Sequence, residues 1–200
     1  MQQAPVVPVL VINQLEHAVP LAKALVSGGL KVLEITLRSD VALAAIEQII
    51  AHVPEAIVGA GTVVNEAQLK ALDERNVAFA VSPGLTPTLL AAAEHYEVAL
   101  LPGVANASQI MQGMEFGYQN FKFFPAEVSG GVPALKSFAG PFAQLQFCPT
   151  GGISAANYQS YLALDNVSCV GGTWVAPNDL VNSEQWSSIT ELARAACLRA

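Results

Sequence analysis

The chain has 200 residues, of which 52% are hydrophobic and only 12% carry a formal charge. This composition excludes a disordered, collagen-like or coiled-coil protein, and a chain of this length buries a sizeable core without disulfides or structural metals. Nine basic residues against sixteen acidic ones give a net charge of −7, which excludes nucleic acid and anionic membranes as expected partners. We expect one domain over residues 1–200, in which local groups hold any anionic ligand.

The cysteines and the N-terminal sequence indicate a reduced protein without a targeting segment. Cys148, Cys169 and Cys197 are an odd number and lie far apart in the sequence. No apolar run reaches the length of a membrane span without interruption, and the first five residues lack the basic region of a signal peptide. We therefore expect a cytoplasmic protein with free thiols.

Short apolar runs and alanine-rich stretches alternate along the whole chain. The runs, which we predict to be strands, are residues 6–12, 32–36, 57–60, 79–81, 99–101, 121–124, 146–148 and 167–170. Segments between them, such as 41–50 and 67–74, have the apolar spacing of helices. Eight such units predict a (β/α)8 TIM barrel, and a doubly wound open sheet is the alternative.

Lys122 is the charged residue whose surroundings are least expected, because it lies within the predicted strand 121–124 among three phenylalanines. Side chains alternate along a strand, so Phe121 and Phe123 share one face while Lys122 and Phe124 share the other. If the first pair packs against the helices, Lys122 points into the barrel. Burial favours the neutral amine, which attacks carbonyls, so we predict a covalent nucleophile. The alternative is a structural ion pair.

The predicted strand 32–36 supplies a partner for Lys122. Glu34, Thr36 and Arg38 alternate with apolar residues and therefore share one face. A carboxylate beside the lysine favours its charged form and a guanidinium favours its neutral form, and the sequence leaves open which prevails. Glu34 suits proton transfer, and Arg38 suits a bidentate contact with a carboxylate.

Glycines follow three predicted strands, at residues 59–61, 151–152 and 171–172. Glycine lets backbone N–H groups approach an anion closely, and the loops after the seventh and eighth strands of a barrel often bind phosphate. We therefore predict a phosphate site at residues 151–152 and 171–172. The alternative is that these glycines only form tight turns. The first segment is similar to a dinucleotide-binding sequence, but Val64 replaces its third glycine, so we exclude a nucleotide.

The sequence gives no support for a metal or a cofactor. His17, His52 and His95 lie in or beside predicted helices without the spacing of metal ligands. The patterns H-E-x-x-H, C-x-x-C and G-x-S-x-G are absent. We expect metal-independent covalent catalysis without a cofactor.

Five ordered segments resemble the bacterial 2-keto-3-deoxy-6-phosphogluconate (KDPG) and 4-hydroxy-2-oxoglutarate (KHG) aldolases. The segments are LEITLR at 33–38, GAGT at 59–62, SPG at 82–84, FKFFPAE at 121–127 and CPTGGIS at 148–154. The resemblance covers nearly the whole chain, from about residue 6 to the predicted C-terminal helix.

The resemblance implies a role for each matched residue. Lys122 would form the Schiff base, and Glu34 would shuttle protons. Arg38 and Thr62 would hold the pyruvyl carboxylate, Pro83 and Phe124 would line the pocket, and the phosphate would lie near Gly151, Gly152 and Thr173. Thr173 stands where the family usually has serine. Thr150 is our candidate for a contact with a substrate hydroxyl.

The resemblance also implies the reaction and the assembly. A homotrimer would cleave 2-dehydro-3-deoxy-6-phosphogluconate to pyruvate and glyceraldehyde 3-phosphate, and would also act on 4-hydroxy-2-oxoglutarate. Its partner would be a small phosphorylated keto acid. The alternatives are an aldolase for the galactonate epimer, a phosphosugar epimerase or decarboxylase on the same barrel, and a non-catalytic phosphosugar-binding protein.

Overall fold

The computed structural model describes residues 4–198, so the first three and last two residues of the predicted domain lie outside the described part. Strands and helices alternate along it. The strands are β1 (Val6–Leu10), β2 (Val32–Thr36), β3 (Ile57–Gly61), β4 (Phe79–Val81), β5 (Ala99–Leu101), β6 (Gly103–Val104), β7 (Asn120–Phe123), β8 (Gln146–Pro149) and β9 (Val170–Gly172). The helices are the 3₁₀ turn η1 (Leu15–His17) and α1 (Ala18–Ser27), α2 (Ala42–His52), α3 (Glu66–Asp73), α4 (Pro87–Ala93), α5 (Ala107–Glu115), α6 (Gly131–Phe138), α7 (Tyr158–Leu162), α8 (Asn178–Asn182) and α9 (Trp186–Leu198).

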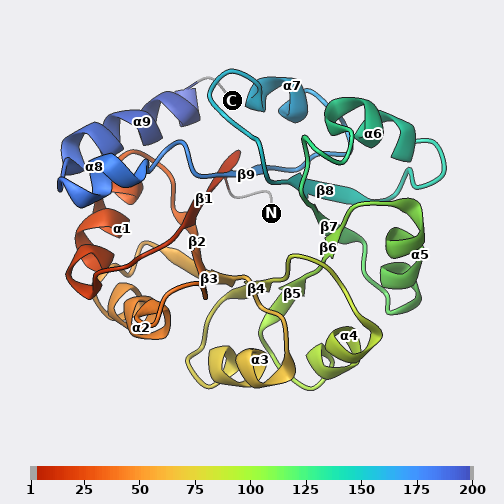
Figure 1. Ribbon diagram of the computed structural model, residues 1–200, viewed down its shortest axis with the longest axis horizontal. Helices are drawn as coiled ribbons and strands as arrows, with labels where there is room; N and C mark the ends of the chain where they lie inside the picture. Colours follow the sequence, from red (N-terminus) through yellow and green to blue (C-terminus); the bar gives the residue numbers. More distant parts are fainter. Residues whose placement is uncertain (1–3, 199–200) are drawn as a thin grey trace.

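All paired strands are parallel, and they form two curled sheets. One sheet has the order β5-β4-β3-β2-β1-β9, and the other has the order β6-β7-β8. Figure 1 shows the strands around a common centre, with the helices on the outside. The chain therefore has an α/β fold whose helices cover the outer face of the sheets, unlike a doubly wound sheet with helices on both faces.

The predicted strands agree closely with the observed ones at most positions. Residues 32–36, 79–81 and 99–101 are confirmed as strands β2, β4 and β5. Strands β1, β3, β7 and β8 begin and end within two residues of the prediction. The alternation of apolar runs with alanine-rich segments was therefore a reliable guide to the element order.

The prediction for residues 167–170 is wrong for its first three residues. Strand β9 begins at Val170, and Val167 forms only an isolated bridge with Phe147. The Phe147 N–H donates to the Asn166 carbonyl and the Ser168 N–H donates to the Phe147 carbonyl. The chain therefore touches β8 at this point and pairs with β1 only from Val170 onward.

Strand β6 was not predicted as a separate element. Pro102 separates it from β5 and has no N–H to donate to a neighbouring strand. The Lys122 N–H donates to the Pro102 carbonyl at 2.9 Å, and the Phe124 N–H donates to the Val104 carbonyl at 3.0 Å. Residues 102–104 thus fix the position of β7, the strand that carries Lys122.

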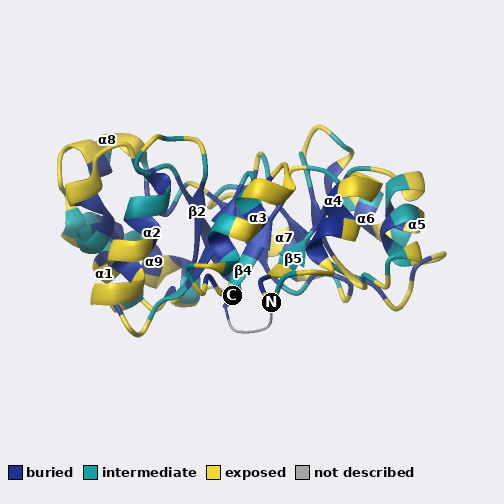
Figure 2. Cartoon of the chain, turned by 90° about the horizontal axis from the view of Figure 1, so that it is seen from below, coloured by how far each residue is buried: buried dark blue, intermediate teal, exposed yellow. Residues whose placement is uncertain are grey.

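The core lies between the strands and the surrounding helices. Figure 2 shows buried residues concentrated on the inner sides of the helices and along the strands, with exposed residues on the outer helix faces. Phe121 and Phe123 are fully buried, and their rings pack near Phe147 of β8 and Phe138 of α6. This packing confirms that the aromatic face of β7 points to the helices, so the opposite face points inward. Within residues 4–198, no helix has the length and apolar character needed to cross a bilayer.

Candidate active site

Lys122 points into the centre of the molecule, and its environment is largely closed to solvent. The residue is 6% exposed and lies between β6 and β8, in register with Gly103 and Cys148. Its Nζ atom lies 5.2 Å from the centroid of the Phe124 ring, close enough for an interaction with the ring face. The inward direction predicted from side-chain alternation is therefore confirmed.

Lys122 is paired with Glu34 across the interior. The Nζ atom lies 3.3 Å from Oε1 of Glu34, which is itself 4% exposed. The two residues are 88 positions apart in the sequence, and strands β2 and β7 bring them together. An acid–base group is thus within hydrogen-bond reach of the amine, the geometry required for proton transfer at that nitrogen.

Two glycines on β3 make room for neighbouring side chains, Gly61 for that of Glu34 and Gly59 for that of Phe79. A Cβ atom on Gly61 would overlap the carboxylate of Glu34, and a Cβ atom on Gly59 would overlap the ring of Phe79. Thr36, which shares the inward face with Glu34, donates its hydroxyl to the Leu10 carbonyl at 2.8 Å. Thr36 therefore links β2 to β1 rather than facing a ligand.

A cavity of about 360 Å³ opens above Lys122. Its lining consists of Val9, Arg38, Thr62, Pro83, Lys122, Phe124, Thr150, Gly151, Gly152, Ile153, Gly172 and Thr173. The structure thus gathers the candidate residues from the sequence around one cavity, except Glu34, which lies behind Lys122, and Gly171, which is not part of the lining. Gly172 belongs to the second glycine pair of the predicted phosphate site and lines the cavity as expected. Val9 and Ile153 were not among the candidates, although the period-two alternation of β1 could have revealed Val9.

Arg38 supplies the positive charge of this cavity beside Lys122. Its side chain is exposed, and it has no ion-pair partner among residues 4–198. A guanidinium free of protein carboxylates is available for a bidentate contact with an anionic ligand. In a protein of net charge −7, such a local positive charge favours an anionic ligand in the cavity.

Thr62 has a strained backbone at the end of β3. Its φ angle is +62°, in the left-handed region that β-branched residues rarely adopt. Such strain persists only where the surroundings impose it, and it concentrates at functional sites. The sequence placed Thr62 in the site but gave no sign of this conformation.

Thr150 carries a buried hydroxyl without a partner. The residue is 6% exposed, and its Oγ1 atom makes no hydrogen bond to any residue from 4 to 198. An unsatisfied buried hydroxyl is unfavourable by about 1–3 kcal/mol. Its position in the cavity lining therefore suits a hydrogen bond to a ligand.

The glycine loop after β8 borders the same cavity. Gly151 and Gly152 have φ angles of +97° and +80°, which glycine adopts without strain. Successive residues in such conformations can turn their N–H groups toward an anion. Thr173, after β9, lies on the same side of the cavity lining and adds an exposed hydroxyl.

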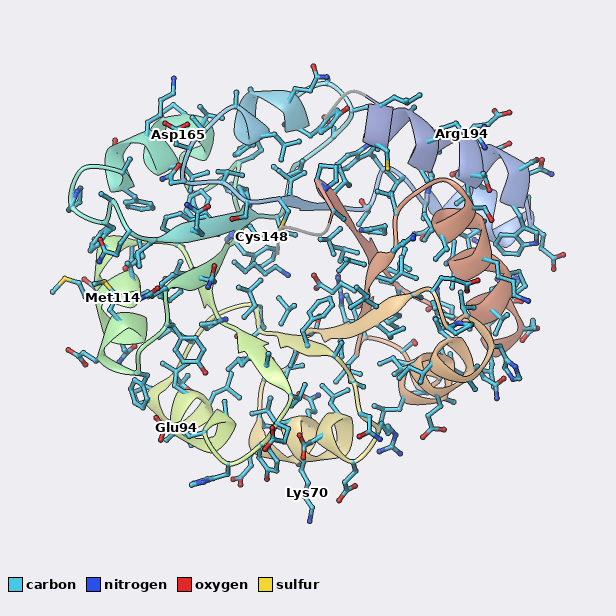
Figure 3. The ribbon with its side chains drawn as sticks, turned by 180° about the vertical axis from the view of Figure 1, so that it is seen from behind. Lys70, Glu94, Met114, Cys148, Asp165 and Arg194 are labelled. Atoms are coloured by element: carbon cyan, nitrogen blue, oxygen red, sulfur yellow. The ribbon has the colours of Figure 1, made fainter. Side chains whose placement is uncertain are left out.

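A second cavity of about 410 Å³ lies on the opposite side of the Lys122–Glu34 pair. It is lined mainly by apolar residues, together with Glu34, Asn120, Cys148 and Cys169. Figure 3 shows Cys148 near the centre of the ring, whereas the labelled Lys70, Glu94 and Arg194 lie at its outer rim. Lys122 thus faces one cavity and Glu34 the other, an arrangement that the sequence did not predict.

The two inner cysteines are free thiols that contact each other. A side-chain hydrogen bond with Cys169, reinforced by burial, raises the pKa of Cys148 well above its usual range. The same hydrogen bond lowers the pKa of Cys169. Cys148 lies on β8 and Cys169 directly precedes β9, and the fold packs the two side chains together. No group of three or more His, Cys, Asp or Glu residues able to hold a metal occurs within residues 4–198.

Comparison with known proteins relates this geometry to a family. The model of the KDPG and KHG aldolase family matches residues 1–192. The KHG/KDPG aldolase of Escherichia coli (strain K12) is 56% identical over 192 residues, which cover 96% of this chain and 90% of that protein.

Solved structures give the same result. The KDPG aldolase of Legionella pneumophila, with pyruvate captured at low pH as a covalent carbinolamine intermediate, has a TM-score of 0.96 and 48% identity, over 98% of this chain and 95% of that one. The 2-keto-3-deoxy-6-phosphogluconate aldolase of Zymomonas mobilis ZM4 with 3-phosphoglycerate has a TM-score of 0.93 and 50% identity, over 100% and 93% of the two chains. With this identity along nearly its whole length, the chain belongs to the KDPG and KHG aldolase family.

Proposed function

We propose that this chain is a class I aldolase that cleaves KDPG to pyruvate and glyceraldehyde 3-phosphate through a Schiff base on Lys122. The same reaction on KHG gives pyruvate and glyoxylate. The observation that carries the proposal is the buried Lys122 amine, 3.3 Å from the Glu34 carboxylate, at the base of a cavity that also contains Arg38. The sequence and structural similarity to proteins named KDPG aldolase supports the proposal.

In the covalent steps, the amine acts as the nucleophile, and the iminium that it forms acts as the electron sink. Neutral Lys122 attacks C2 of the keto acid, and loss of water from the carbinolamine gives an iminium. When a base removes the C4 hydroxyl proton, the C3–C4 bond breaks, its electron pair moves to the iminium, and the aldehyde leaves. The enamine then takes a proton at C3, and water hydrolyses the new iminium to pyruvate and free Lys122. Glu34 is placed to take and return the protons at Nζ.

Different residues of the cavity would bind different parts of the substrate. Arg38 and Thr62 would bind the carboxylate beside C2, and Pro83 and Phe124 would pack against the keto acid. The phosphate would lie at the other side of the cavity, on Gly151, Gly152 and Thr173. The substrate is thus a small phosphorylated keto acid, and no step requires a metal or a cofactor.

Borohydride trapping tests the covalent step. In the presence of pyruvate and sodium borohydride, the iminium on Lys122 is reduced to a stable secondary amine, and peptide mass spectrometry should find the pyruvyl group there. Exposed Lys70 serves as the internal control and should stay unmodified. An epimerase or decarboxylase that uses Lys122 only as a charge would give no adduct, and a non-catalytic binding protein would also release no pyruvate from KDPG or its galactonate epimer.

We expect Thr150→Val to separate stability from substrate recognition. The substitution keeps the shape of the side chain and removes a buried hydroxyl that has no protein partner. The Tm should stay the same or rise, because the unsatisfied group is unfavourable by about 1–3 kcal/mol. The kcat/KM for KDPG should fall about tenfold, the effect of one lost hydrogen bond of about 1.4 kcal/mol. A lower Tm with unchanged kcat/KM would contradict the assignment.

We also propose that the two sheets form one closed (β/α)8 barrel. On one side, the bridge Phe147–Val167 links β8 to the segment before β9, and the bridge Thr150–Gly171 links the residue after β8 to β9 itself. On the other side, only Pro102 separates β5 from β6. Both junctions support closure, which brings the C-terminal ends of β2, β3, β7 and β8 to one face, where barrel active sites lie.

A further inference from the structure

A buried tyrosine and a carboxylate form a pair beside the glycine loop, outside the cavity lining. The Tyr161 hydroxyl, on α7, donates a hydrogen bond to Oε1 of Glu127, in the turn after β7. Tyr161 is fully buried, whereas Glu127 is exposed. Burial, together with the bond to Glu127, raises the pKa of Tyr161, so the phenol stays protonated and remains a donor.

Glu127 is packed against the glycine loop. A Cβ atom on Gly152 would lie 2.5 Å from Cγ of Glu127, so the side chain directly covers that glycine. The Glu127 N–H donates to the Gly151 carbonyl at 3.1 Å, and the Ala126 N–H donates to the Thr150 carbonyl at 2.8 Å. The position of Glu127 is therefore coupled to the conformation of Gly151 and Gly152.

Asn157 holds the loop from its other end. Its Nδ2 group donates to the Gly152 carbonyl at 3.0 Å, and its Oδ1 atom accepts from the Ser154 N–H at 2.8 Å. The carbonyls of Gly151 and Gly152 are thus both engaged on the protein side. The Glu127 side chain packs against the same loop, and its carboxylate is held by the hydrogen bond from Tyr161.

Because the Glu127 carboxylate is negatively charged, the direction in which it points affects a phosphate bound nearby. A carboxylate beside a phosphate site repels the phosphate, and the bond from Tyr161 holds the Oε1 atom toward α7. Gly131 leaves space for the pair, because a Cβ atom there would lie 3.0 Å from the Tyr161 hydroxyl. Without that hydroxyl, the carboxylate is free to turn toward the anion.

We propose that Tyr161 is a positioning residue for phosphate recognition: through Glu127 it holds the Gly151–Gly152 loop in shape and keeps a negative charge away from the substrate phosphate. The inference deepens the proposed function and rests on its assignment of the phosphate to this loop. Tyr161 does not line the cavity and acts only through Glu127.

Kinetics with two substrates test the proposal. Tyr161→Phe should raise the KM for KDPG about tenfold, with kcat within about twofold, because loss of the hydrogen bond from Tyr161 releases the Glu127 carboxylate, which then repels the phosphate. Both parameters for KHG, which has no phosphate, should stay at wild-type values. The double variant Tyr161→Phe/Glu127→Gln, which lacks the charge, should recover most of the KM for KDPG.

Tyr158→Phe is the matched control. Tyr158 lies on the same helix, is 3% exposed, and its hydroxyl has no hydrogen-bond partner within residues 4–198. The control should change the KM for neither substrate, and the Tm of each variant should confirm that it is folded.

An unchanged KM for KDPG in Tyr161→Phe, or an equal rise for both substrates, would overturn the proposal. If the wild-type protein cleaves neither substrate, the proposed function fails instead. If Tyr161→Phe does not fold, the test uses the double variant Tyr161→Phe/Glu127→Gln. A tenfold higher KM for KDPG in that variant would contradict the proposal that the Glu127 charge repels the phosphate.

Discussion

Lys122→Met is expected to abolish turnover while leaving the protein folded. Methionine fills most of the volume of the lysine side chain but has no amine, so the Schiff base cannot form. The kcat for KDPG should fall by about 10³-fold or more, the scale typical for loss of a covalent nucleophile. Pyruvate and borohydride should leave the protein unmodified at position 122. Retention of more than a few per cent of the activity would contradict a covalent role.

The stability of this variant separates catalysis from structure. Removing one partner of a buried ion pair is unfavourable by about 3–5 kcal/mol when the other charge stays buried, and less when Glu34 takes up a proton. The double variant Lys122→Met/Glu34→Gln has no unpaired charge and should regain most of the lost Tm. It should nevertheless stay inactive. If restoring the Tm also restored activity, Lys122 would be only half of a structural ion pair.

The sequence was sufficient to find the buried Lys122–Glu34 pair because both residues interrupt an apolar alternation. In residues 121–124, a lysine takes one of two inward positions, and in residues 32–36 a glutamate takes one of three. A charge at an inward position of a core strand is unfavourable unless it is paired or used, which makes the pattern informative. Strand order then brought the two together, and the observed Nζ–Oε1 distance is 3.3 Å.

Other features of the site depend on tertiary packing that local patterns do not encode. The left-handed φ angle of Thr62 arises from the turn that leads out of β3, and threonine has no preference for it. Glu127 ends the FKFFPAE segment, but Tyr161 lies 34 residues further on in a segment without a distinctive pattern, so nothing in the sequence linked the two. The shift of β9 from residue 167 to residue 170 reflects competition between β8 and β1 for pairing.

Glu34→Gln is expected to slow the reaction without preventing adduct formation. The amide has the size of the carboxylate and still accepts a hydrogen bond from Lys122, but it cannot take up a proton. The kcat should fall by about 10²- to 10⁴-fold, the usual contribution of general acid–base catalysis. The KM should change little, because Glu34 lies behind Lys122 and does not line the substrate cavity. Steady-state kinetics with KDPG and timed borohydride trapping with pyruvate measure the two effects.

Glu47→Gln provides the same chemical change at a surface ion pair. Glu47 lies 2.7 Å from Nε of Arg75, and both side chains are partly open to solvent, so this variant should retain wild-type kinetics. A normal kcat for Glu34→Gln would mean that water or the substrate moves the protons at Nζ. An altered KM with an unchanged kcat would instead place Glu34 among the substrate-binding groups, which its position beside the second cavity argues against.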